Sequence, residues 1–490
     1  MLEIVTGCVV VLACAVLYWR ARLVESKAHP LPPAYSGLLP IIGHTHLLLT
    51  DTSTIWLTAK KISEFTMKNG GVAFGQFGFG DSIYYFITDP EDAFVVANTC
   101  LDKHFLYGFA KYWLGEGLIT GSGNHWHRHR QLLKPSFSLP IINGYLEIFN
   151  SQSRILLSSL ESSSEKGKTD ITPQVRKFSL ASSYLTTFGK AASSEKNIQK
   201  YMKATDEMLC LVMERFQKFW LHNEFIYTLL GYKKLEAELL NSIGEVTNEI
   251  MQTKESFFNE TQDQSTYISY RPLIQLILEQ HSTNQFTDYE ISEELHTSIV
   301  AAYETTASSL LSVLVMIGSF PKVQEKIYEE IMQVLGSDRD VDKEDLRKLV
   351  YTEAVVKETL RLLPTVPVLL RYIDRDVKLK NYTLRAGTNC MLFSCGLQRH
   401  SSWGPDADEF RPERWLDPST LPPFVATDAA FSYGKRSCLG KTYAMTTLKV
   451  AVAHIVRKYV ITGDYTKLKY ELDITLKVFE GHEIGLERRS

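Results

Sequence analysis

The sequence lacks the features that mark several common classes of protein. Its seven cysteines are scattered, odd in number and without a CxxC pair, which argues against a disulfide framework and favours a reducing compartment. Acidic and basic residues almost balance at a net charge of −3, so the chain has no general attraction for nucleic acid. It contains no glycine-rich fingerprint for a nicotinamide or flavin nucleotide. No internal repeat or long low-complexity linker divides the chain after Pro40, which favours one large domain.

An apolar run at the N-terminus predicts a membrane anchor over residues 1–22. Residues 4–19 are almost unbroken in their hydrophobicity, and about 18 residues with the flanks just span a bilayer. Glu3 precedes the run while Arg20 and Arg22 follow it, and this order places the rest of the chain in the cytosol. A cleaved signal peptide is the alternative, but it needs the opposite charge order and a small-residue cleavage site.

Proline and glycine are concentrated in the next segment, residues 23–43. Because proline fixes the backbone angle φ, the run Pro30-Leu31-Pro32-Pro33 predicts a stiff hinge that holds a domain off the membrane. The remaining residues, 44–490, are expected to form that domain and to carry the catalytic site.

One stretch near the C-terminus carries the clearest chemistry. It reads Phe-Ser-Tyr-Gly-Lys-Arg-Ser-Cys-Leu-Gly, and a helical pattern begins directly after it. A cysteine at the start of a helix has its thiolate stabilised by free N–H groups and the helix dipole, and the thiolate is the form that binds metals. Gly434 can adopt a left-handed conformation, Gly440 lets backbone or a flat ligand approach without a Cβ in the way, and Arg436 adds a positive charge beside the sulfur. The loop therefore suits a soft anionic ligand held against a flat group; a buried structural thiol is the alternative.

The pattern Phe-x-x-Gly-x-Arg-x-Cys-x-Gly resembles the haem loop of the cytochrome P450 monooxygenases. All five marked positions match, and they are Phe431, Gly434, Arg436, Cys438 and Gly440. The resemblance implies a mainly α-helical fold with small β-sheets, in which a long central helix lies over the haem, and a transmembrane helix precedes this fold. It also implies haem b as the cofactor, with Cys438 as the axial iron ligand and no other covalent bond.

A second set of residues matches positions through which the family holds the haem propionates. Trp126 and Arg130 are four residues apart and so share one face of a predicted helix. Spacing alone favours an amphipathic helix with a solvated basic face. The resemblance instead implies that both donate charge-assisted hydrogen bonds to one propionate and that Arg371 contacts the other. Residues 113–137 resemble in particular the animal branch that includes fatty-acid ω-hydroxylases.

The same segment contains a histidine pair with the spacing of metal ligands. His125 and His129 are four residues apart, as zinc ligands on a helix often are. No HExxH pattern and no third ligand are evident in the sequence, so zinc is not favoured. A basic rim at this place is better suited to docking an acidic electron donor.

Helical periodicity over residues 288–318 predicts one helix long enough to cross a whole domain. In its middle, Glu304 and Thr305 place a carboxylate beside a hydroxyl, a pair that can pass protons from solvent to a ligand on a metal. The pair resembles the family's oxygen-activation motif and is expected to be catalytic; a partly exposed mid-helix pair is the simpler alternative.

Two neighbours of this pair depart from the family pattern. Ala302 stands where the motif usually has glycine, and its methyl group would narrow the oxygen groove. Ala301 stands where several members of the branch carry a glutamate that bonds covalently to the haem. We therefore expect a haem that acid and solvent can extract.

A glutamate and an arginine three residues apart mark another predicted helix, expected over residues 343–363 with Asp342 as its N-cap. Glu358 and Arg361 meet on one face, and an isolated pair of this kind is a weak surface ion pair. In the family the pair is buried and completed by an arginine that corresponds to Arg414, so these three residues are expected to be structural.

The rest of the C-terminal half predicts short strands. They are expected at residues 366–373, 381–384 and 388–393, with a closing hairpin after Tyr459. Val366, Val368 and Leu369 would line the substrate pocket. The aromatic cluster over residues 219–227 either caps the substrate channel against the bilayer or forms an ordinary core helix.

These features favour a haem-thiolate monooxygenase that inserts one atom of O2 into a small lipophilic substrate, such as a fatty acid, hormone, odorant or xenobiotic. Electrons would come from NADPH through a separate flavoprotein reductase, with cytochrome b5 as an optional second donor. The basic residues expected to dock the donor are Arg128, Lys134, Lys435 and Lys441. The predicted anchor implies a single-pass protein of the endoplasmic reticulum membrane, in contact with membrane lipid, with its catalytic domain in the cytosol.

Two other classes of function stay open at this point. One is a haem-thiolate isomerase or dehydratase that needs no reductase, against which the intact Glu304-Thr305 pair argues. The other is a haem protein without catalytic activity that binds an apolar ligand. A requirement for NADPH and reductase separates the first from a monooxygenase, and oxygen-dependent product formation separates the second.

Overall fold

The computed structural model describes most of the chain after its N-terminal segment. The described residues are 30–78, 82–164, 167–189, 195–251, 270–281, 285–422, 427 and 429–489. The expected membrane anchor, residues 1–22, lies outside them, as do residues 23–29 of the expected hinge. The cysteines among the described residues are free thiols.

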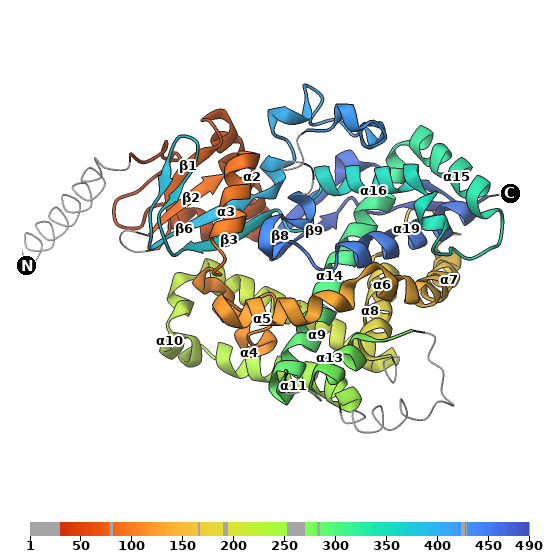
Figure 1. Cartoon of the computed structure of the whole chain (residues 1–490), viewed down its shortest axis with the longest axis horizontal. Helices are drawn as coiled ribbons and strands as arrows, with labels where there is room; N and C mark the ends of the chain where they lie inside the picture. Colours follow the sequence, from red (N-terminus) through yellow and green to blue (C-terminus); the bar gives the residue numbers. More distant parts are fainter. Residues whose placement is uncertain are drawn as a thin grey trace, which may run out of the picture.

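Helices make up most of the fold, as the sequence predicted (Figure 1). The longer ones are α2 (Thr52–Lys68), α3 (Pro90–Thr99), α5 (Gly123–Leu133), α7 (Leu146–Ser164), α8 (Thr172–Phe188), α9 (Glu195–Gln217), α11 (Tyr232–Met251), α13 (Leu273–His281), α14 (Asp288–Ser319), α15 (Pro321–Leu335), α16 (Val350–Leu362) and α19 (Lys441–Lys458). Shorter helices are α4 (Lys111–Leu114), α6 (Leu139–Gly144), α10 (Glu224–Leu229) and α17 (Ser394–Leu397). Two 3-10 turns, η9 (Ala429–Phe431) and η10 (Gly434–Arg436), precede α19.

Helix α14 runs through the middle of the helical part and confirms the long helix predicted there. A capping box fixes its start, because the Thr287 hydroxyl accepts the Glu290 N–H while the Glu290 carboxylate accepts the Thr287 N–H. Leu310 and Leu314 then pack in the main hydrophobic core with Leu448 of α19. Among the described residues, α14 alone is long and apolar enough to cross a membrane, but 78% of its most apolar window is buried, as in a core helix.

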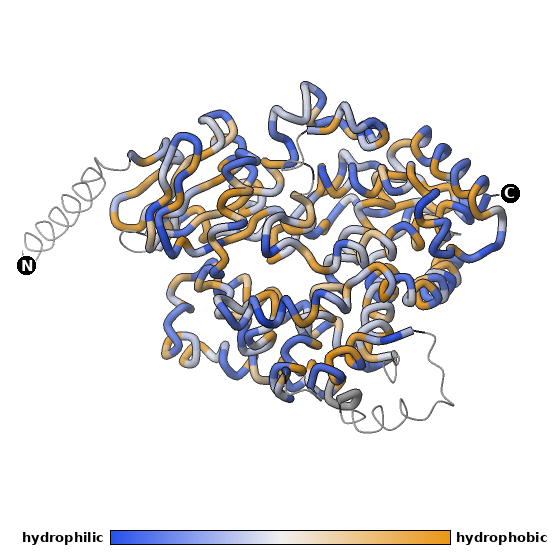
Figure 2. Tube along the Cα trace, in the orientation of Figure 1, coloured by the Kyte–Doolittle hydropathy of each residue, from blue (hydrophilic) through white to orange (hydrophobic). Residues whose placement is uncertain are grey.

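A four-stranded sheet lies at the left of Figure 1 and joins distant parts of the chain. Its strands follow the order β1 (Val72–Gln76), β2 (Ile83–Ile87), β6 (Thr388–Phe393), β3 (Val368–Ile373). The central pair β2 and β6 is parallel, and the outer pairs are antiparallel. Hydrophobic residues run along these strands in Figure 2. Trp56 and Ile62 of α2 pack with Phe86 and Phe393, so α2 covers one face.

Strands β3 and β6 confirm the strands predicted at 366–373, where β3 begins at Val368, and at 388–393. Three two-stranded sheets complete the C-terminal half of the described chain; β5 falls within the predicted 381–384 and the predicted closing hairpin is present. Strand β4 (Val377–Lys378) pairs with β5 (Thr383–Leu384), and β8 (Lys469–Asp473) forms a hairpin with β9 (Thr475–Glu480). Strand β7 (Tyr459–Thr462) pairs with β10 (Gly485–Arg488), which closes the chain against the end of α19.

The helix predicted from residue 343 is wrong at its start, because α16 begins at Val350. The Asp342 carboxylate does accept backbone N–H groups, but those of Glu344 and Asp345, which begin a 3-10 turn. The first N–H groups of α16 are instead accepted by the Glu330 carboxylate on α15, at 2.6 Å for Tyr351 and 2.8 Å for residue 352. A cap supplied from another helix cannot be read from the local sequence.

Candidate active site

The loop before α19 holds Cys438 in a fixed position. After η9 and η10, Gly440 is the N-cap of α19. The Cys438 N–H donates a hydrogen bond of 2.9 Å to the Phe431 carbonyl, which closes the loop. Gly434 has the left-handed φ that was predicted, +71°, and a Cβ there would lie 2.7 Å from the Ala97 carbonyl oxygen. Only glycine therefore fits at this turn.

Burial and nearby charge act in opposite directions on the Cys438 thiol. The side chain is accessible, yet burial is the largest influence on its pKa, which is raised, so the sulfur lies at an inner surface. The Gly440 N–H, Arg130 and Lys441 favour the thiolate without outweighing burial. The positive charge expected from Arg436 is not among these influences. A thiolate at this depth is stable beside a bound cation, and a coordinated thiol loses its proton outright.

Four cationic side chains lie together between α5, β3 and this loop. Arg130 donates to the Ser437 hydroxyl at 3.3 Å, and the Arg436 guanidinium lies 4.0 Å from the centre of the Trp126 ring. Lys103 pairs with Arg371 in an isolated β-bridge. Burial, together with the charges of Arg371 and Arg436, lowers the pKa of Lys103 well below its ordinary value. Burial and Arg371 likewise lower the pKa of Arg436 to about 9.

Several donors of this cationic cluster have no acceptor. Nε of Arg371 and both Nε and Nη1 of Arg436 are buried without a hydrogen-bond partner among the described residues. The Asp102 carboxylate acts on Arg436 from a distance, but burial and the charge of Arg371 outweigh it. A buried cation without a counter-charge is strongly destabilising. The cluster therefore fits an anionic ligand that brings carboxylate oxygens beside the cysteine loop.

Helix α14 presents Glu304 and Thr305 in a setting different from an exposed pair. Thr305 donates its hydroxyl hydrogen to the Ala301 carbonyl at 2.6 Å. Glu304 is only 5% exposed, and its two carboxylate oxygens lie 3.5 Å from Nη2 of Arg176 and 3.4 Å from Nζ of Lys477. Glu304 is thus a buried, doubly paired carboxylate, whereas Thr305 is half-buried beside it.

Glu304 forms part of the wall between two cavities. The more polar cavity, of about 300 Å³, is lined by Glu304 together with Arg176, Asp206, Asp473 and Lys477, and also by apolar residues. An apolar cavity of about 400 Å³ on the other side is also lined by Glu304. Burial would lower the pKa of Lys477, but the carboxylates of Glu304 and Asp473 outweigh it and raise the pKa. The carboxylate of Glu304 is therefore held by cations at the boundary between polar and apolar space.

The apolar cavity is bounded by segments from both ends of the chain. Helices α2, α9 and α14 and strands β3 and β6 contribute to its lining. The three residues predicted to line a substrate pocket do so, namely Val366, Val368 and Leu369. Ala301 and Thr305 face the same cavity, whereas Ala302 packs against the main hydrophobic core.

The comparison with known families shows which family the chain belongs to. A family model described as Cytochrome P450 matches residues 40–473. The chain belongs to the cytochrome P450 family. The match includes the Cys438 loop, the whole of α14 and the α5 segment with Trp126 and Arg130.

Named relatives place this P450 in an animal branch of the family. It is 30% identical to "Cytochrome P450 4c21" of Blattella germanica over 92% of this chain and 91% of that protein. It is 27% identical to "Cytochrome P450 4V2" of Homo sapiens over 94% of this chain and 90% of that protein. It is 29% identical to "Cytochrome P450 4d8" of Drosophila melanogaster over 79% of this chain and 88% of that protein. These names confirm the branch that the sequence resembled.

Members of the P450 family are haem-thiolate monooxygenases that bind haem b through an axial cysteine, and this chain is such an enzyme. The residues around the Cys438 loop fit a haem group. The orphaned donors of Arg371 and Arg436 and the low-pKa Lys103 suit two propionates, and Cys438 places a thiol at an inner surface beside them. The propionates of haem would supply the anionic charge for the cationic cluster, and its iron would supply the cation for the Cys438 thiolate.

The predicted structural triad is buried and fully connected. The Glu358 carboxylate accepts hydrogen bonds from Arg361 at 2.8 and 2.9 Å and from Nε of Arg414 at 3.0 Å. The indole N–H of Trp415 and the backbone N–H of Arg411 also donate to it, each at 2.9 Å. All three charged side chains of the triad are completely inaccessible to solvent. The triad ties α16 to the segment that leads into the cysteine loop.

The sequence did not indicate the residues that contact the predicted site residues from distant parts of the chain. Lys103 completes the cationic cluster, and Arg176 and Lys477 hold Glu304. None of them stands in a recognisable motif, because each reaches the site through a tertiary contact. Of the cations predicted to dock an electron donor, Lys134 and Lys435 are exposed and Lys441 is half-buried, while Arg128 pairs with the Glu290 carboxylate.

Proposed function

We propose that Cys438 ligates the haem iron and that Trp126, Arg130, Arg371 and Arg436 hold the propionates. The observation that carries this assignment is the cluster of buried cations with unpaired donors beside an inner-surface thiol. Lys103 would add a further positive charge, because Arg371 and Arg436 already depress its pKa and a carboxylate would relieve that repulsion. Phe431, Gly434 and Gly440 would shape the loop around the sulfur.

The proposed catalytic residues are Glu304 and Thr305. When bound, the haem supplies activation of dioxygen and insertion of one oxygen atom into a substrate C–H bond. The position of Glu304 between a polar and an apolar cavity supports a role as the carrier of protons from the polar side. Its ion pairs with Arg176 and Lys477 would have to open as the carboxylate turns toward Thr305. The Thr305 hydroxyl would then pass the proton onward within a site that otherwise excludes water.

The substrate is proposed to be a lipophilic molecule, such as a fatty acid, hormone, odorant or xenobiotic. The lining of the larger cavity supports this proposal, because Leu209, Val212, Met213 and Phe216 of α9 face it. Binding would be driven by burial of apolar surface, at about 25 cal/mol for each Å² removed from water. Displacement of haem-bound water by a panel of lipids, seen as a spectral shift, would identify the class.

A membrane location is also proposed, with residues 1–22 as an anchor in the endoplasmic reticulum, residues 23–43 as the hinge and residues 44–490 as a cytosolic catalytic domain. Exposed apolar side chains support contact with lipid, since Phe225 and Leu229 of α10 are 75% and 72% exposed. We expect removal of residues 1–29 to leave the CO spectrum intact and to release the protein from membranes on flotation. Retention on the membrane would point to α10 and its neighbours as the main contact.

Electron transfer is proposed to come from NADPH through a flavoprotein reductase, with cytochrome b5 as an optional second donor. The exposed Lys134, four residues after Arg130, and Lys435, next to Arg436 in the cysteine loop, support an acidic partner. Lys435→Glu should raise the reductase concentration needed for half-maximal turnover several-fold and should leave the CO spectrum unchanged. An effect equal to that of Lys467→Glu, far from the cysteine loop in sequence, would remove Lys435 from the docking surface.

The axial ligand is tested with Cys438→Ala, compared with Cys210→Ala, which removes another accessible free thiol. The reduced protein with carbon monoxide should lose the absorption band of thiolate-ligated haem in the first variant and keep it in the second. An unchanged band in Cys438→Ala would exclude Cys438 as the ligand. Because Cys210 lies in the wall of the polar cavity, only the spectrum and not turnover is compared.

Proton delivery is tested with Glu304→Gln in the reconstituted system of reductase, NADPH and substrate. Product formation should fall by about 100-fold or more, the usual contribution of a positioned acid or base, while NADPH oxidation continues. Lys477→Met should have a smaller effect, because Arg176 still pairs with Glu304. Unchanged product yield in Glu304→Gln would refute this role. Product formation without NADPH would instead support the isomerase alternative.

A further inference from the structure

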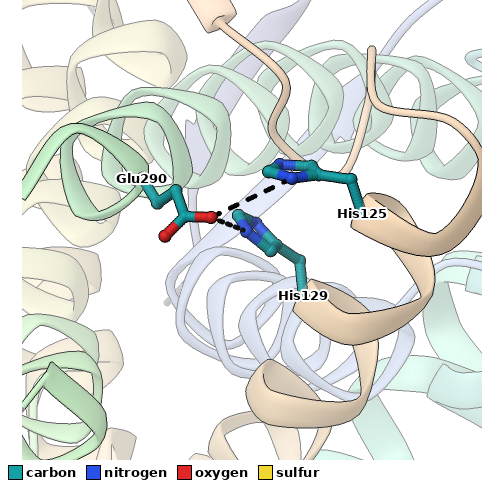
Figure 3. A group of neighbouring side chains, drawn as sticks. All are labelled: His125, His129 and Glu290. Atoms are coloured by element: carbon teal, nitrogen blue, oxygen red, sulfur yellow. Dashed lines mark hydrogen bonds and ion pairs between the residues drawn. The ribbon is translucent and has the colours of Figure 1, made fainter. Parts of the chain in front are cut away.

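Two histidines of α5 and one glutamate of α14 point their ligand atoms at a common place (Figure 3). Nε2 of His129 lies 3.2 Å from Oε1 of Glu290, and Nδ1 of His125 lies 3.9 Å from the same oxygen. One ligand atom from each residue lies within 4.8 Å of the other two. Tetrahedral zinc with bonds of about 2.0–2.1 Å separates its ligands by roughly 3.3 Å, so the group needs only small adjustments to hold an ion.

We propose that His125, His129 and Glu290 form a binding site for a divalent cation of the zinc class, separate from the haem. The sequence had offered the histidine pair without a third ligand, and the fold supplies Glu290 from 161 residues further along the chain. Two imidazoles and one carboxylate are a common zinc ligand set, with a fourth position left for water. The mixed nitrogen and oxygen donors also suit Ni²⁺, Co²⁺ and Cu²⁺.

Two of the three ligands are already oriented by other residues. Oε2 of Glu290 accepts the backbone N–H of Thr287 at 2.8 Å and its hydroxyl at 3.0 Å, which leaves Oε1 directed toward the imidazoles. Nδ1 of His129 lies 2.6 Å from the buried Glu294 carboxylate, which leaves Nε2 directed toward Oε1 of Glu290. A carboxylate behind a histidine ring is the usual outer partner of a metal-binding histidine.

The pKa shifts of Glu290 and His125 favour metal binding, whereas that of His129 opposes it. Burial would raise the pKa of Glu290, but the Thr287 N–H and the His129 ring outweigh it and lower the pKa to about 2, so its carboxylate is charged. Burial and the neighbouring His129 lower the pKa of His125, which keeps that ring neutral. Burial would also lower the pKa of His129, but Glu294 outweighs it and raises the pKa, so a metal would bind at the expense of that proton.

The Arg128 guanidinium would compete with a metal ion for the space between these ligands. Its Nη2 contacts Oε1 of Glu290 and lies 2.9 Å from Nε2 of His129, so it holds the position between two of the ligands. The side chain is 42% exposed and can swing into solvent. Removal of Arg128 should therefore tighten metal binding, whereas an ion-pair cluster without a metal role gives no reason for such an effect.

A bound ion would fasten α5 to the first turn of α14. Helix α5 also carries Trp126 and Arg130, which are proposed to hold a propionate, and α14 carries Glu304 further along. The site would thus brace the frame around the haem without touching the reacting atoms. Binding to the folded state alone raises its stability with the concentration of free ion.

The test titrates the full-length, haem-loaded protein with Zn²⁺ by isothermal calorimetry, beginning with metal-free buffer. We expect one Zn²⁺ per chain, with affinity about 10-fold or more weaker in His125→Ala and in Glu290→Gln. Gln at position 290 still completes the capping box, so the start of α14 is kept. The matched control is His127→Ala, which removes an exposed histidine of the same helix and should bind Zn²⁺ as the parent does.

Two further results decide the proposal. Arg128→Ala should bind Zn²⁺ more tightly than the parent, and Zn²⁺ should raise the Tm of the parent and not that of His125→Ala. Equal affinity in His125→Ala and His127→Ala would overturn the proposal, as would weaker binding in Arg128→Ala or no stoichiometric binding at all. The CO spectrum of each variant shows independently whether the haem site is intact, so failure here is distinct from failure of the haem assignment.

Discussion

The buried triad around Glu358 allows a stability prediction with a definite size. Glu358→Gln keeps the shape of the side chain and removes its charge, so no cavity is created. Two guanidinium groups that are completely inaccessible, those of Arg361 and Arg414, then lose their shared carboxylate. Arg414 keeps its ion pair with Asp406, but Arg361 is left with backbone carbonyls as its only acceptors. Removing one partner of a buried ion pair costs about 3–5 kcal/mol, because a buried charge loses its counter-charge. This is a large part of the 5–15 kcal/mol by which folded proteins are usually stable.

The expected loss can be measured as a change in Tm. With about 2 cal/mol/K of unfolding entropy per residue, a domain of about 450 residues loses roughly 1 °C for each kcal/mol, so Tm should fall by roughly 3–5 °C. The matched control is Glu279→Gln, whose carboxylate pairs with Arg271 where both side chains are about half exposed. An exposed pair contributes about 1 kcal/mol at most. If Glu358→Gln changed Tm no more than Glu279→Gln does, the triad would not be the stabilising element inferred here.

Three other predictions concern the loop, a buried histidine and the haem. Gly434→Ala should reduce the haem content measured after purification, because the left-handed φ costs about 1–2 kcal/mol in a non-glycine residue and the new Cβ would meet the Ala97 carbonyl. Burial lowers the pKa of His454 from 6.5 to about 4, so the stability it contributes is full above pH 6.5 and is lost as pH falls toward 4. His454→Gln should flatten that decline in the free energy of unfolding by up to about 1.4 kcal/mol per pH unit, measured by urea titration. Acidified solvent should extract the haem completely, because residue 301 is alanine, and mass spectrometry of the protein should show no haem adduct.

The sequence was most informative where spacing along the chain controls the outcome. The Cys438 loop, the length of α14 and the common face of Trp126 and Arg130 each depend on residues close to one another, and the structure has the loop, the helix and the α5 segment as predicted. Gly434 is a similar case, because its positive φ follows from a tight turn whose pattern is local. Because these features depend on residues close together in the chain, the sequence alone predicted both the motifs and the helices or loops that carry them.

The sequence was least informative where a partner comes from a distant segment. The Glu330 cap moves the start of α16 to Val350, and it lies on another helix. Lys103 meets Arg371 only because the chain forms a β-bridge there. Glu290 reaches the histidine pair across the contact between α5 and α14. Such pairings depend on tertiary packing, and neither hydrophobic periodicity nor a fixed spacing in the sequence predicts them.

In the proposed haem site, the cationic cluster would link the binding of haem to the stability of the protein. The pKa of Arg436 is lowered to about 9 by burial and by Arg371, and the pKa of Lys103 is lowered further by burial and by both arginines. Because both pKa values are lowered, the fold without an anion disfavours the charged forms of Arg436 and Lys103. A ligand with two carboxylates removes the repulsion and satisfies the orphaned donors in one step. In the proposed site, relief of this repulsion would add to the affinity for haem, and ligation by Cys438 would add selectivity for a group that carries a metal.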